Sequence, residues 1–207
     1  MAGLLFAIGI TGVLGFFVWI AKRPADPERL KAASNWMGYV ATAAAVVIPA
    51  VVFAKYVAPT HLGPLNGLIP LHLGGTSEFP LTEDVAFSNR MIAFASASVP
   101  LAIAAWSLLS TRRLFRLYAH QEVFSKESLA LLSTVSLGLC LYVLASFLAE
   151  APITAALSLG RVEGPHGMSL TLKIEDLSVL FVAGLVRVFA QVMAHAIRIA
   201  DENASFV

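Results

Sequence analysis

The strongest constraint in this sequence is a set of five long, almost uncharged stretches of apolar residues. A helix that crosses the hydrocarbon core of a bilayer needs roughly 20 mostly apolar residues. Four stretches carry no charged residue, and the fifth contains one arginine. They are Ala2–Ile20, Met37–Ala54, Met91–Thr111, Ser128–Ala149 and Leu177–Ile197. The sequence therefore predicts an all-α integral membrane protein with a five-helix transmembrane bundle.

The composition is also that of a membrane protein. Hydrophobic residues make up 58% of the chain and charged residues only 13%, whereas a soluble domain has about 25% charged residues. In a lipid bilayer, apolar side chains can lie on the outer surface of the protein without the free-energy cost that they would have in water. A net charge of +1 gives no reason to expect direct nucleic-acid binding. The single cysteine, Cys140, excludes an internal disulfide.

The chain divides into an N-terminal transmembrane helix, residues 1–21, and a four-helix transmembrane domain, residues 30–207. An apolar N-terminal stretch can instead be a signal peptide that is removed. Here no basic residue precedes it, and no small-x-small cleavage motif precedes the Lys22-Arg23 pair. We therefore expect the first helix to be retained.

Basic residues are concentrated in alternate connections between the apolar stretches. The connections at 59–84 and 151–175 are poor in them, and these two segments are expected to be the external loops. The other two connections hold Lys22, Arg23, Arg29, Lys31, Arg112, Arg113, Arg116 and Lys126. Since basic residues favour the cytoplasmic side, we expect the N-terminus outside and the C-terminus inside.

Two connections carry patterns of their own. Apolar and polar residues alternate over 169–175, which is typical of a half-buried strand, and a second strand is expected at 157–162. These two segments predict a small external β-element. Residues 111–121 form a basic amphipathic segment, which predicts an interfacial helix against anionic membrane lipids. Its basic residues are Arg112, Arg113 and Arg116. The next helix is expected to begin with Ser125 as its N-cap.

Two stretches resemble a known family. They are Leu114-Phe115-Arg116-Leu117-Tyr118 with Glu122-Val123-Phe124-Ser125-Lys126-Glu127 after it, and the closing His195-Ala196-Ile197-Arg198-Ile199-Ala200-Asp201-Glu202-Asn203. Over residues 30–207 the chain resembles the small bacterial multipass membrane proteins of domain-of-unknown-function family 2975. The family's turn after the first motif often has glycine, where this chain has Gln121-Glu122.

The resemblance implies a protein of the bacterial cytoplasmic (inner) membrane with no assigned activity. Members of the family are often encoded beside a small Cro/CI-like helix-turn-helix regulator, which implies membrane-linked regulation. The family provides no catalytic residue that could be carried over to this sequence.

Arg187 is the most informative polar residue, because it lies in the middle of an apolar stretch. A charge at the centre of a bilayer costs about 2.5–3.5 kcal/mol on insertion scales. Gln191 and His195 follow at four-residue steps and share its helix face, which we expect to point into the bundle. Two interpretations remain open. The three residues form an anion-binding polar site, or Arg187 is a structural residue satisfied by carbonyls, hydroxyls or the Glu150 carboxylate.

No motif of an enzyme is present. The sequence lacks a glycine-rich phosphate loop, a nucleophile elbow and a His-Glu-x-x-His motif. His195 is the one histidine within an apolar stretch, so no metal ligand set and no cofactor are predicted. The expected function is a non-enzymatic interaction or regulatory protein that docks a protein partner at the cytoplasmic face through its inner loop and C-terminal tail. A small transporter or channel subunit with a polar site around Arg187 is the alternative, and homo-oligomerisation stays open.

Overall fold

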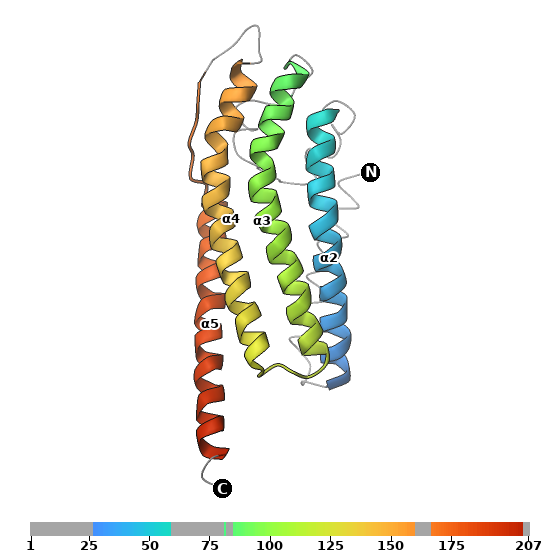
Figure 1. Ribbon diagram of the computed structural model, residues 1–207, viewed down its shortest axis with the longest axis vertical. Helices are drawn as coiled ribbons and strands as arrows, with labels where there is room; N and C mark the ends of the chain where they lie inside the picture. The colour runs from blue at the N-terminus through green and yellow to red at the C-terminus, as the bar shows by residue number, and fades with distance from the viewer. Residues whose placement is uncertain (1–26, 59–80, 82–84, 160–166, 205–207) are drawn as a thin grey trace.

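The computed structural model describes residues 27–58, 81, 85–159 and 167–204 (Figure 1). The predicted N-terminal helix and most of the predicted loop 59–84 lie outside these residues. The described part contains four long α-helices: α2 (Pro27–Val57), α3 (Phe87–Ala119), α4 (Lys126–Leu159) and α5 (Ile174–Ala204). Each is long and apolar enough to cross a membrane. The predicted transmembrane class and four of the five expected helices are therefore confirmed.

The helices pack mainly in chain order, with α2 on α3, α3 on α4 and α4 on α5 (Figure 1). α3 and α4 approach closely because small residues face each other. A Cβ atom added to Gly138 of α4 would lie 2.9 Å from Cβ of Ser107 on α3, and such small pairs are typical of membrane helix contacts. A buried apolar cluster that includes Val52, Ala97 and Leu157 joins α2, α3 and α4. It lies near the C-terminal end of α2, the N-terminal end of α3 and the C-terminal end of α4.

Local hydrogen bonds define the turn between α3 and α4. The backbone N–H of Ser128 donates to Ser125 Oγ at 3.0 Å, so the predicted N-cap is confirmed. At the end of α3, the N–H groups of Gln121 and Glu122 donate to the carbonyls of Tyr118 and Leu117 at 3.1 and 3.0 Å. This pattern is a Schellman motif. Gln121 has a φ of 63°, a left-handed conformation that favours glycine, which agrees with the glycine that the resemblance implies for this turn.

The predicted external β-element is wrong for the residues that the structure describes. Residues 157–159 are the last turn of α4, and Ile174 and Glu175 are the first residues of α5. Between them, residues 167–173 form neither helix nor strand; we call this segment the strap. The predicted loop 151–175 is therefore shorter than expected, because α4 continues through Pro152 to Leu159.

Three polar side chains of α4 bind the backbone of the strap, and we call them the polar ladder. Glu150, Thr154 and Ser158 are spaced by four residues, so they lie on one face of α4, about 6 Å apart along its axis. Two residues of extended chain advance by about 6.6 Å, so every second strap residue meets a ladder side chain. The contacts are Ser158 Oγ to the Gly167 carbonyl at 3.1 Å, the Ser169 N–H to Thr154 Oγ1 at 3.1 Å and the Thr171 N–H to Glu150 Oε2 at 2.8 Å.

The strap determines where α5 begins. It runs back along α4, so that α5 starts partway along α4 and extends past the ends of the other helices (Figure 1). Asp176 fixes the first turn, because its Oδ2 accepts the N–H of Lys173 at 3.1 Å. This is the backward contact of a capping box. The alternating pattern at 169–175 thus correctly indicated extended backbone, but the partner of that backbone is a helix.

The polar ladder makes a prediction about Thr154. Thr154→Val removes the acceptor of the Ser169 N–H and should lower the free energy of unfolding by about 1 kcal/mol, because a partly buried donor loses its partner. Thr134→Val is the matched control, because Thr134 Oγ1 bonds the Ala130 carbonyl of its own helix. Thermal unfolding in detergent and hydrogen exchange at the Ser169 amide measure the effect. Equal losses in the two variants would contradict a role for the ladder.

Candidate functional site

The end of the bundle where α3 ends and α4 begins is rich in basic residues, and we call it the basic end. The predicted interfacial segment is not a separate helix there, because residues 111–119 are the last turns of α3. Its amphipathic pattern is present. Leu114 is buried, whereas Arg112, Arg113 and Arg116 are exposed.

Contacts between neighbouring helices define the axial position of α5. The hydroxyl of Ser136 on α4 donates to the carbonyl of Ala183 on α5 at 2.9 Å, which makes these residues level. Ser136 lies one half-turn closer to the basic end than Gly138, and Gly138 is level with Ser107 of α3. At about 1.5 Å per residue, Arg187 then lies about 9 Å from the level of Ser107 toward the basic end.

This position is level with Arg113, which lies six residues beyond Ser107 and therefore also about 9 Å from it. Arg187 is in the middle of its apolar stretch in the sequence, but it is not in the middle of the bundle. The displacement of α5 moves it to the depth of the basic residues at the end of α3. A charge nearer the end of a span costs less than a charge at mid-membrane.

The face of α5 that bears Arg187 does not point into the bundle. Among the residues of α5 whose burial the structure describes, Ala183 and Ala190 are buried, on the side toward α4, whereas Arg187, Gln191 and His195 are all exposed. The prediction that this face points inward is wrong for the residues that the structure describes, because small residues rather than polar ones pack on α4. The suggested carboxylate partner, Glu150, binds the strap instead.

An exposed apolar stripe runs along a third side of α5, and the sequence reasoning missed it. Its residues are separated by alternating steps of three and four, the heptad spacing with which helices pair. The sequence contained this signal, but it was obscured because most residues of the stretch are apolar. We call the following set the α5 stripe: Val182, Leu185, Phe189, Val192, Ala196 and Ile199.

The last three turns of α5 project beyond the basic end. The register set by Ser136 and Ala183 places Met193 level with Lys126, the first residue of α4. We call residues 193–204 the overhang. It carries the end of the α5 stripe and an exposed ion pair between Arg198 Nε and Glu202 Oε1 at 3.7 Å. An exposed pair of this kind adds little stability.

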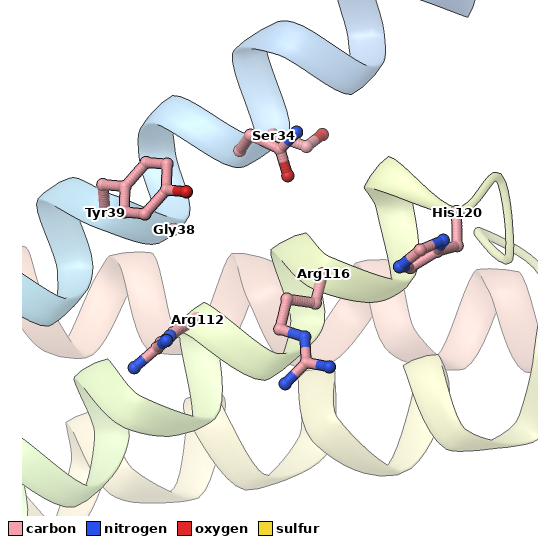
Figure 2. A pocket seen from close by; sticks show the side chains of 7 residues that line it. Ser34, Gly38, Tyr39, Arg112, Arg116 and His120 are labelled. Atoms are coloured by element: carbon pink, nitrogen blue, oxygen red, sulfur yellow. The ribbon is translucent and has the colours of Figure 1, made fainter.

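A groove of about 250 Å³ opens between α2 and α3 at the basic end (Figure 2). α3 contributes Arg112, Arg116 and His120, and α2 contributes Ser34, Asn35, Gly38 and Tyr39. The groove thus brings together two of the three predicted interfacial arginines. Arg113 is on the same helix but does not line the groove.

The fold defines a multipass membrane protein whose described residues are helical apart from short connections and the strap. A family model described as "Protein of unknown function (DUF2975)" matches residues 19–207. The chain belongs to this family, as its two motifs indicated. No curated protein and no solved structure matches it.

The register makes a prediction about the depth of Arg187. In a Cys140→Ala background, nitroxide labels at Arg187→Cys and Arg113→Cys should report the same depth in a lipid nanodisc. A label at Phe181→Cys is the control, since Phe181 is exposed and lies six residues, or about 9 Å, deeper. Electron paramagnetic resonance with paired relaxation agents measures these depths. A label at position 187 as deep as that at position 181 would contradict the register.

Proposed function

We propose that this chain is a non-enzymatic interaction protein of the bacterial cytoplasmic membrane that holds a regulatory protein partner at the cytoplasmic face. The overhang of α5 is the observation that carries this proposal. Its exposed Ile199, and the exposed Val192 directly before the overhang, belong to an apolar stripe with heptad spacing. Such a stripe suits pairing with an amphipathic helix of another protein.

The distribution of charge supports a cytoplasmic position for the overhang. Lysine and arginine residues near the ends of spans favour the cytoplasmic side. Arg112, Arg113, Arg116 and Lys126 all belong to the basic end, and the overhang projects from that end. The C-terminus is then inside, and a partner from the cytoplasm reaches the end of the α5 stripe on the overhang without entering lipid.

The partner that we propose is a soluble regulator of the Cro/CI helix-turn-helix type, the kind of protein that the family resemblance implies. Contact with nucleic acid would be made by that partner and not by this chain. The transporter or channel alternative has less support. Arg187, Gln191 and His195 are exposed, so they line no enclosed passage between the described helices.

The proposal predicts that partner binding depends on the α5 stripe. A double variant, Val192→Ser with Ile199→Ser, should weaken binding of the purified regulator to the detergent-solubilised chain by about tenfold or more. The reason is that central apolar anchors of an interface each contribute about 1–2 kcal/mol. Binding is measured by titration with a labelled regulator.

A second double variant, Gln191→Ala with Arg198→Ala, is the matched control. It changes two exposed residues at the same level of α5 but on the polar side of the helix. It should bind the regulator as the unchanged chain does. If instead the stripe variant binds normally, or both variants bind equally weakly, docking through the α5 stripe is refuted.

A further inference from the structure

The groove between α2 and α3 has a one-sided charge distribution. Arg112, Arg116 and His120 follow each other at four-residue steps, so they share one side of α3. Figure 2 shows them along α3, with Ser34 and Tyr39 on the adjoining α2. None of the seven lining residues is acidic. Such a set attracts an anion.

The two arginines have no carboxylate partner among the described residues. Like charges four residues apart on a helix destabilise it by about 0.2–0.5 kcal/mol. The negative end of the helix dipole favours basic residues in the last turn, which accounts for Arg116 but reaches Arg112 poorly. An anion between the two guanidinium groups would offset their repulsion.

The side of the groove formed by α2 supplies neutral polar groups. Ser34 is buried, at 3% exposure, and Asn35 and Tyr39 add an amide and a hydroxyl group. Gly38 adds no side chain to the groove, and a Cβ there would make an ordinary contact with Phe115 Cβ at 3.9 Å. Two guanidinium forks with hydroxyl and amide donors match the several oxygen atoms of a phosphate group.

The depth of the groove indicates where this phosphate comes from. Tyr39 is 73% exposed and Trp36 42% exposed, and both belong to α2 at the level of the groove. Tyrosine and tryptophan are enriched where the hydrocarbon core meets the headgroups. Arg29 and Lys31 of α2 lie further toward the end of the helix. The groove is therefore at headgroup level, where lipid phosphates are concentrated.

We propose that this groove is a binding site for the phosphate group of an anionic phospholipid, with Arg112 and Arg116 as the main ligands. The site is separate from the α5 stripe, and the proposal does not depend on a protein partner. Lipid bound there contacts α2 and α3 together and stabilises their packing at the basic end.

The test uses the full chain in a mild non-ionic detergent with added phosphatidylglycerol, and phosphatidylcholine of the same acyl chains as the neutral lipid. Native mass spectrometry measures retained lipid, and thermal unfolding measures stabilisation. Phosphatidylglycerol should bind at least tenfold more tightly than phosphatidylcholine. Arg112→Gln and Arg116→Gln should each reduce that binding by about tenfold, since each loses charge-assisted hydrogen bonds.

Arg113→Gln is the matched control, because it removes the same charge from the same turn of α3 but not from the groove. It should leave phosphatidylglycerol binding unchanged. Arg116→Lys keeps the charge and the helix but loses the planar fork, so it should bind less well while folding normally.

Equal losses in Arg113→Gln and Arg112→Gln would show a diffuse charge effect and overturn the site. Normal binding in Arg112→Gln and Arg116→Gln would overturn it as well. Inorganic phosphate, added at the concentration of the lipid, distinguishes the sources of phosphate. If it stabilises the chain as much as phosphatidylglycerol does, the ligand is a soluble phosphate and the lipid proposal is wrong.

Discussion

Backbone groups in an apolar environment must find hydrogen-bond partners, and this requirement organises the second half of the chain. Non-helical backbone within a membrane persists only where protein or water satisfies its polar groups. In the strap, residues 167–173, the carbonyl of Gly167 and the N–H groups of Ser169 and Thr171 find such partners in the side chains of Ser158, Thr154 and Glu150. Because helix and extended chain advance by nearly the same distance per contact, three consecutive contacts form without distortion of either partner.

The position of α5 follows from these contacts. An α5 that began at the end of α4 would place Arg187 in the middle of the bundle, with the full cost of burying a charge in lipid. The strap instead lets α5 begin partway along α4, which brings Arg187 level with Arg113. The same displacement leaves the overhang, residues 193–204, beyond the other helices. One set of hydrogen bonds thus brings Arg187 level with the basic residues of α3 and leaves an exposed apolar stripe on the end of α5.

The sequence was most informative where a pattern depends on residues close in the chain. Four apolar stretches, the N-cap at Ser125 and the exposed basic residues at 112, 113 and 116 were predicted correctly. Extended backbone was predicted for residues 169–175, and the structure shows it up to Lys173. The element on which this backbone packs was not predicted, because alternation describes the conformation of a segment and not the element that covers it.

Errors arose where a pattern depends on the register between distant elements. The inward orientation of Arg187, Gln191 and His195 was inferred from the cost of a charge at mid-membrane. That inference assumed that each apolar stretch is centred in the bilayer. The contact between Ser136 and Ala183, which shows the displacement, joins residues 47 positions apart in the chain. Nothing in the local sequence specifies it.

Disulfide trapping tests the register of α5 most directly. In a Cys140→Ala background, Ser136→Cys with Ala183→Cys should form a disulfide rapidly and in high yield in the membrane under mild oxidation. The paired control is Ser136→Cys with Ile197→Cys, since Ile197 would lie beside Ser136 if α5 began level with the end of α4. The account predicts cross-linking at 183 and none at 197. Efficient cross-linking at 197 with none at 183 would contradict it.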